Sequence, residues 1–104
     1  MYSKLVRDNI PDIIKANGEN PITEVLSDER YKKELENKLI EECNEVINSS
    51  GIDRIEELAD LLEVMIAMSN LENKTIEDVD KVRIKKKEKR GGFSKKIYLK
   101  DVER

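Results

Sequence analysis

The sequence of 104 residues has no histidine, no tryptophan, one cysteine and four aromatic residues. The lone cysteine, Cys43, cannot form an internal disulfide, and its place on the apolar side of a helical pattern favours core packing over reactivity. The chain also has no apolar run of transmembrane length and no signal-peptide pattern. We therefore expect a soluble, cytoplasmic protein in a reducing compartment, with no membrane partner.

The composition indicates a helical protein with a small apolar core. Apolar residues make up 38% of the chain and charged residues 41%, which is typical of surface-rich helices and not of a β-sandwich or barrel. A chain of this length forms one domain, here residues 1–104, and so thin a core often continues across a subunit interface. The net charge of −3 argues against a general nucleic-acid-binding protein.

Two helices are predicted in the first half of the chain. Residues 10–17 form a short amphipathic helix, with Asp8 or Asn9 as its cap and Pro11 in its first turn. A long helix follows over residues 28–47, capped by Ser27 or Asp28. Its buried side is predicted to consist of Leu35, Leu39, Cys43, Val46 and Ile47.

The second half continues the helical pattern. A tight turn at residues 48–51 folds a helix over residues 55–70, with Asp53 as its cap, back against the long helix. Thr75 and Asp78 form a capping box for a further helix, which Gly91 and Gly92 stop. Residues 22–26 and 97–99 are each compatible with a short strand or an extended segment. The expected fold is all-α: an antiparallel helical hairpin plus a third helix, with short extended termini.

Four carboxylates lie where a core helix usually carries apolar groups. At about 100° per residue, Val64 lies about 20° from Glu57, so Glu57 points toward the core, and Asp60 lies about 60° away on the same side. Glu42 and Glu45 border the apolar stripe of the preceding helix in the same way. The antiparallel return then sets one pair of acids opposite the other.

Buried carboxylates need a positive partner, because an isolated buried carboxylate is costly and takes up a proton instead. Without histidine, a metal there would be held by oxygen alone, which selects a hard cation such as Mg²⁺ or Mn²⁺. The alternative is that some of these acids lie at the helix margin and meet solvent or Lys38.

A basic face follows near the C-terminus, where Arg83, Lys86 or Lys87, and Arg90 share one side of the last helix. This face is compatible with a solvated helix end, whose lysines favour the C-terminal dipole, or with a nucleic-acid patch. It is also compatible with a phosphate clamp opposite an acidic metal site, as nucleoside triphosphate chemistry requires.

These motifs resemble those of a known superfamily. The segment EECNE at residues 41–45, followed by ELAD at residues 57–60, resembles the EExxE…ExxD signature of the all-α nucleoside triphosphate pyrophosphohydrolases, the MazG-like superfamily. The segments KLVRDNIP at residues 4–11 and RGGF at residues 90–93 resemble the ends of its phosphoribosyl-ATP pyrophosphohydrolase-like branch. The resemblance covers nearly the whole chain and implies a MazG-like fold, with a four-helix core completed by dimerisation.

The resemblance also implies roles for individual residues. The implied metal ligands are Glu42, Glu45, Glu57 and Asp60. Glu41 would support these ligands or activate water, and Lys38 would act beside it as a catalytic residue. The residues on the substrate and phosphate side would be Lys4, Arg7, Asp8, Arg83, Lys86, Lys87 and Arg90.

The implied activity is hydrolysis of a nucleoside triphosphate between its α and β phosphates, with Mg²⁺ or Mn²⁺, to give a nucleoside monophosphate and pyrophosphate. The segments at residues 4–11 and 90–93 are not part of the sequence pattern of the phosphoribosyl-ATP pyrophosphohydrolases of histidine biosynthesis. We therefore favour house-cleaning of nucleotide pools over phosphoribosyl-ATP hydrolysis. A non-catalytic helical binding or regulatory module is the alternative from a different class. The expected assembly is a homodimer or a tetramer, without nucleic acid.

Overall fold

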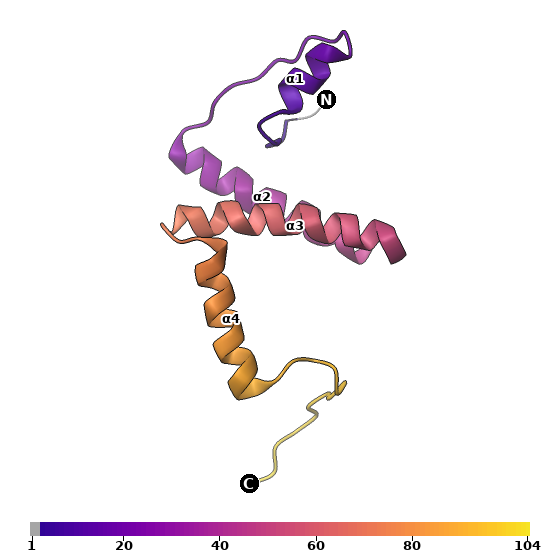
Figure 1. The fold of residues 1–104 in the computed structure, drawn as a ribbon, viewed down its shortest axis with the longest axis vertical. Helices are drawn as coiled ribbons and strands as arrows, with labels where there is room; N and C mark the ends of the chain where they lie inside the picture. Colours follow the sequence, from indigo (N-terminus) through magenta and orange to yellow (C-terminus); the bar gives the residue numbers. More distant parts are fainter. Residues whose placement is uncertain (1–2) are drawn as a thin grey trace.

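The computed structural model describes residues 3–104, which form four α-helices and no strand (Figure 1). The helices are α1 (Ile10–Ala16), α2 (Asp28–Ile47), α3 (Gly51–Leu71) and α4 (Ile76–Arg90). The predicted all-α class is therefore confirmed. None of these helices is both long and apolar enough to cross a membrane.

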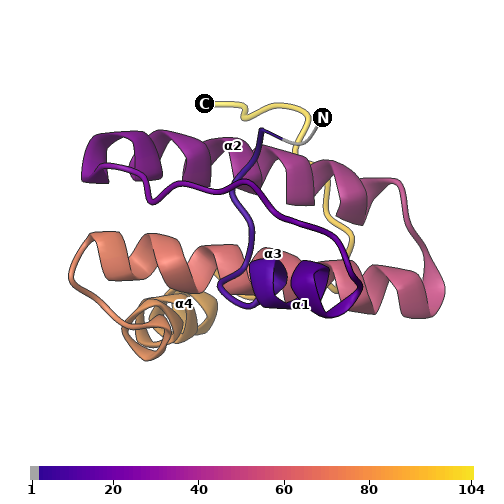
Figure 2. The same cartoon turned by 90° about the horizontal axis from the view of Figure 1, so that it is seen from above.

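The centre of the fold is a hairpin in which α2 and α3 run antiparallel, side by side over most of their length (Figure 2). The turn between them is short, and it is fixed by hydrogen bonds to its backbone: the Arg54 Nε donates to the Ser49 carbonyl at 2.8 Å and the Ser49 hydroxyl to the Val46 carbonyl at 3.0 Å. Leu35 of α2 and Val64 of α3 are the buried apolar residues of the resulting core. The hairpin predicted from the helical periodicity is thus present.

The helix starts follow local capping chemistry. The Ser27 hydroxyl accepts a hydrogen bond from the Arg30 backbone N–H at 3.3 Å, as expected for the cap of α2. The Thr75–Asp78 capping box is also confirmed, with both reciprocal bonds formed, at 2.9 and 3.2 Å. The predicted cap of α3 is wrong, because α3 begins at Gly51 after an extended Ser50, which leaves Asp53 inside the first turn. A carboxylate is favourable there as well, since it faces the positive end of the helix dipole.

Of the two alternatives left open for residues 22–26 and 97–99, the extended segment is the one found, and neither stretch pairs as a strand. Most of their apolar side chains are in solvent; Ile22 and Val25 in the first stretch are 97% and 101% exposed, whereas Leu26 is partly buried. Residues 3–104 contain no strand beside either stretch that could satisfy its backbone, so the weak alternation of residues 22–26 has no sheet to join there.

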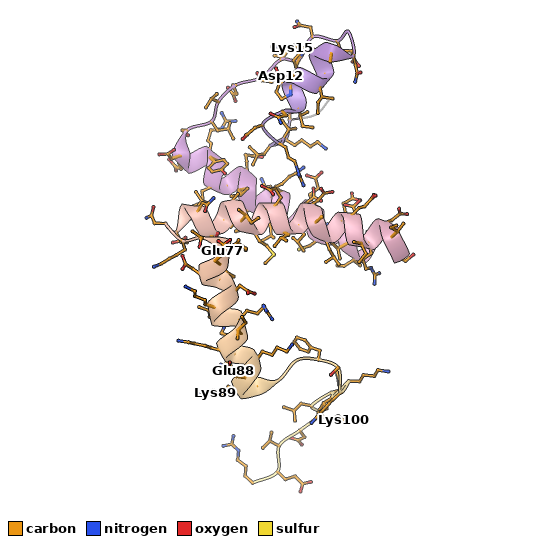
Figure 3. All side chains as sticks on the ribbon, viewed as in Figure 1. Asp12, Lys15, Glu77, Glu88, Lys89 and Lys100 are labelled. Atoms are coloured by element: carbon orange, nitrogen blue, oxygen red, sulfur yellow. The ribbon has the colours of Figure 1, made fainter. Side chains whose placement is uncertain are left out.

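The single chain is elongated. Its radius of gyration is 18.1 Å, whereas a compact domain of this length has about 13 Å. Helix α4 runs across the direction of the hairpin helices. Its labelled residues Glu88 and Lys89 lie at the end that is remote from α2 (Figure 3). Ile47, predicted to be buried, is 71% exposed, because it lies about 120° around α2 from the buried Leu35 and so on another side of the helix. Much of the apolar surface therefore has no partner within one copy.

Candidate metal centre

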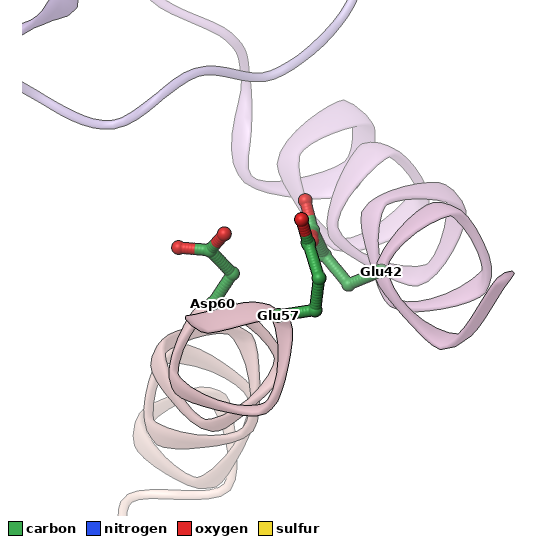
Figure 4. Close-up of side chains that lie close together, drawn as sticks. All are labelled: Glu42, Glu57 and Asp60. Carbon is green, nitrogen blue, oxygen red and sulfur yellow. The ribbon is translucent and has the colours of Figure 1, made fainter. Parts of the chain in front are cut away.

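Three carboxylates converge between the two helices of the hairpin. Glu42 comes from α2, Glu57 and Asp60 come from α3, and one oxygen of each lies within 4.8 Å of the other two. Their side chains point into the same space beside the hairpin (Figure 4). The prediction that the antiparallel return would bring acids of both helices together is confirmed for these three.

The hairpin itself explains this convergence. Glu42 occupies a core position of α2 and is only 8% exposed, whereas Glu57 and Asp60 are half-buried. Glu57 and Asp60 lie three residues apart, which places both on one side of α3. Any cation held here would therefore bind to both helices and tie them together.

Glu45, the fourth predicted ligand, is not among the three converging carboxylates. Its side chain is exposed, in contrast to Glu42 one turn earlier. The helical rotation explains the difference, since Glu45 lies about 60° from Glu42 and so at the margin of the buried stripe. Glu45 still contributes to the local field, because its charge is one of those that raise the pKa of Glu57.

The pKa of Glu57 is raised above its ordinary value. Its partial removal from solvent is the main cause, followed by the negative charges of Asp60, Glu45 and Glu42. A carboxyl group in this position gains from a positive ion more than an isolated surface acid does. A raised acid pKa in a carboxylate cluster is also a known mark of functional sites.

Lysine side chains partly balance this negative charge. The Lys38 Nζ lies 3.3 Å from Glu41 and 3.5 Å from Glu42, and its side chain is mostly buried. Among the predicted ligands, Glu42 thus meets Lys38, as the alternative to a metal site describes. Burial works against ionisation of Glu41, but hydrogen bonds and charge from Lys38 and Lys4 outweigh it and hold the pKa of Glu41 below its ordinary value. Glu41 is thus a charged acid next to the cluster and not a member of it.

The segment before α1 reaches the same place. The Arg7 Nη2 donates to an Asp60 oxygen at 2.7 Å, and the Lys4 Nζ donates to a Glu41 oxygen at 3.5 Å. Two of the three N-terminal residues predicted on the substrate side therefore touch the acidic region. The third, Asp8, is exposed at the start of α1. No local sequence signal indicates the Arg7–Asp60 pair, because the two residues are 53 positions apart.

The donor set suits a hard divalent cation. It consists of carboxylate oxygens, and Mg²⁺ binds such oxygens at about 2.0–2.1 Å, so opposite ligands lie about 4.2 Å apart. Three ligands of an octahedral ion include at least two adjacent pairs, which lie about 2.9 Å apart, so the observed spread of up to 4.8 Å would have to shrink by up to about 1.9 Å through rotation of the three side chains. Water would complete the shell, since Mg²⁺ usually retains several waters. The residues present therefore fit the predicted cation.

The predicted basic face lies elsewhere in the single chain. Arg83 pairs with Asp80 of its own helix at 2.6 Å, and Lys86, Lys87 and Arg90 are exposed along α4, which projects away from the hairpin. A shallow hollow follows the end of α4 and is lined by residues 90–97, among them Arg90, Lys95 and Lys96. Within one copy, then, the structure does not bring this face to the carboxylates.

Comparison with known proteins gives one partial relationship. A stretch of 44 residues is 46% identical to an uncharacterised protein of Mycolicibacterium smegmatis. This match covers 42% of the chain and 45% of that relative, so the chain spans less than half the length of the relative it matches. No family model and no solved structure matches the chain.

Proposed function

We propose that this chain is a Mg²⁺-dependent nucleoside triphosphate pyrophosphohydrolase of the MazG-like superfamily, which cleaves the α–β phosphate bond in the house-cleaning of nucleotide pools. The observation that carries the proposal is the convergence of Glu42, Glu57 and Asp60 from two antiparallel helices. The EECNE and ELAD segments, which contain these residues, support the superfamily assignment. Mn²⁺ is an alternative cation, because it accepts the same oxygen ligands.

The residues around the cluster suit hydrolysis of a phosphoanhydride. Glu42, Glu57 and Asp60 would hold the cation, and Glu45, whose charge acts on Glu57, would be the fourth ligand that the resemblance implies. When bound, the cation would supply positive charge to the phosphoryl oxygens and acidify nearby water. Glu41 is ionised and adjacent, so it can accept a proton from an attacking water. Lys38, fixed beside Glu41 and Glu42, can neutralise negative charge that develops on the phosphates.

We further propose that two copies form a four-helix core from their α2–α3 hairpins. Helix α3 carries apolar residues at 3-4-3 spacing that are 39–63% exposed, namely Ile55, Leu58, Leu62 and Met65. Helix α2 adds Ile40 and Ile47, which are seven residues apart and also exposed. Such a stripe is the pattern of a helix that packs against another helix. A second copy would cover it and would offset the elongation of the single chain.

Product analysis tests the proposed activity. The protein is incubated with Mg²⁺ and a panel of canonical and modified nucleoside triphosphates, and the products are separated by chromatography. We expect nucleoside monophosphate and pyrophosphate from the wild type and from Glu63→Gln, a matched change at an exposed acid of the same helix. Glu57→Gln should abolish turnover. Failure of the wild type to turn over any triphosphate, with normal Mg²⁺ binding, would point to another phosphoanhydride substrate such as phosphoribosyl-ATP. Absence of both binding and turnover would favour a non-catalytic helical module.

A further inference from the structure

The N-terminal segment bridges the two helices of the hairpin at the acidic cluster. Lys4 contacts Glu41 on α2, and three residues later Arg7 contacts Asp60 on α3. Both contacts are ion pairs with substantial solvent exposure; the side chains of Arg7 and Asp60 are 56% and 46% exposed. The segment therefore links α2 to α3 directly beside the cluster, with Arg7 in contact with one of its three carboxylates.

These ion pairs hold the segment weakly. Helix α1, which follows it, buries none of its residues, and α1 packs against no other helix of the described chain. Exposed ion pairs change an equilibrium constant by only about 1.5- to 5-fold. Arg7 can therefore leave Asp60 at little cost, without disturbing the α2–α3 hairpin.

Asp60 has two competing uses. Its carboxylate belongs to the converging trio, and it also accepts the hydrogen bond from Arg7 at 2.7 Å. A divalent cation at the trio would repel the guanidinium and compete with it for the same carboxylate. Glu41, in contrast, lies outside the trio, so the Lys4 pair is not subject to this competition.

We infer that Arg7 changes partner during the reaction cycle: it leaves Asp60 when the cation binds, and then binds phosphate oxygens of the nucleotide that the cation holds. The inference rests on the proposed function and adds to it the exchange of partner by Arg7, which the sequence had placed only in general terms on the substrate side. A guanidinium suits both partners, because its planar donors match carboxylate and phosphate alike. A nucleotide on the trio would bring its phosphates close to the place that Arg7 already occupies. Loss of Arg7 should therefore have opposite effects on cation and phosphate binding.

Calorimetric titration of Arg7→Gln tests this inference, first with Mn²⁺ and then with the Mn²⁺ complex of inorganic tripolyphosphate, which carries the phosphates without a base. We expect Arg7→Gln to bind Mn²⁺ about 2- to 5-fold more tightly, the range of an exposed ion pair. It should bind the tripolyphosphate complex about 10- to 100-fold more weakly, the range for loss of a charge-assisted hydrogen bond. A folding defect would not produce these opposite changes.

Arg30→Gln is the matched control, because Arg30 forms a similar exposed pair with Glu24 at 2.9 Å, away from the trio. It should leave both affinities unchanged, and Arg7→Lys should recover part of the tripolyphosphate binding. If Arg7→Gln leaves the affinities for Mn²⁺ and for the tripolyphosphate complex unchanged, or changes both in the same direction, the inference is wrong. The proposed metal site would not be affected by that result. If the wild type binds Mn²⁺ but not tripolyphosphate, the phosphate role of Arg7 is wrong. If it binds no Mn²⁺, or if Glu57→Gln binds Mn²⁺ as well as the wild type does, the proposed function fails as well.

Discussion

Leu62→Asp is expected to separate the proposed dimer into single chains. Leu62 lies in the middle of the exposed stripe on α3 and is 46% exposed in one copy. Full burial of a leucine contributes about 1.5–3 kcal/mol, so covering the remaining half contributes about 0.7–1.4 kcal/mol for each copy. A two-fold dimer contains the site twice, which gives about 1.4–2.8 kcal/mol from the lost apolar contacts alone.

The introduced charge adds a further penalty, because the new carboxylate of each copy would be taken out of water at the interface without a partner. With a combined cost of at least about 3 kcal/mol, the dimer dissociation constant should rise more than about 100-fold. Sedimentation equilibrium at about 10 µM, a concentration that separates the two states for a dissociation constant near 1 µM, should give twice 12.1 kDa for the wild type and 12.1 kDa for Leu62→Asp. Asn70→Asp introduces the same charge on the same helix away from the stripe and should remain dimeric. A wild-type mass of one chain, or an unchanged mass for Leu62→Asp, would refute the proposed interface.

Three further perturbations test other parts of the account. Because the pKa of Glu57 is raised in the folded chain, the contribution of Glu57 to stability without divalent cations should fall as the pH rises above about 4.5; thermal melts of wild type and Glu57→Gln, with and without Mg²⁺, should differ by this contribution. Glu42→Gln should weaken Mn²⁺ binding more than Glu45→Gln in calorimetry, since Glu42 belongs to the converging trio; equal effects would make Glu45 an equal ligand. Thr75→Ala should lower the free energy of unfolding in urea by about 1 kcal/mol through loss of the α4 cap, with Ser94→Ala, outside any helix, as the neutral control.

Local signals predicted the helices well. The cap at Ser27 and the capping box at Thr75 depend on residues within three positions of each other, so the sequence contains all the information they need. The cap of α3 shows the limit of such signals. Ser50 and Asp53 are both residues that favour the start of a helix, and the choice between them depends on how the turn closes, which local preference does not determine.

The candidate site was predictable to the extent that it depends on helix geometry. Rotation along α3 placed Glu57 and Asp60 on one side, and the short turn placed Glu42 opposite them. Glu45 lies at the margin of the buried side of α2. There, a change of tens of degrees in angular position around the helix determines whether a side chain reaches the cluster or solvent. The contact of Arg7 with Asp60 was not predictable from spacing, since it joins segments that are far apart in the chain and outside any regular periodicity.

Burial was the feature that sequence periodicity predicted least well. Ile47 was assigned to the same apolar side as Leu35, but it lies about 120° from Leu35 around α2, and Leu35 is buried whereas Ile47 is exposed. Periodicity identifies an apolar face but does not say whether that face packs within one chain or against a second copy. The exposed stripe on α3 favours packing against a second copy. We therefore expect the main apolar core of this protein to form in the dimer.

The most direct test of the central claim is a ³¹P NMR time course of the wild-type protein with Mg²⁺ and the best triphosphate of the panel. The account predicts that pyrophosphate and nucleoside monophosphate appear together, without a diphosphate intermediate, and that neither appears with Glu57→Gln. Orthophosphate together with nucleoside diphosphate would mean cleavage at the β–γ bond and would contradict the account. The same spectrum from wild type and Glu57→Gln would contradict it too, because the converging carboxylates would then have no part in the reaction.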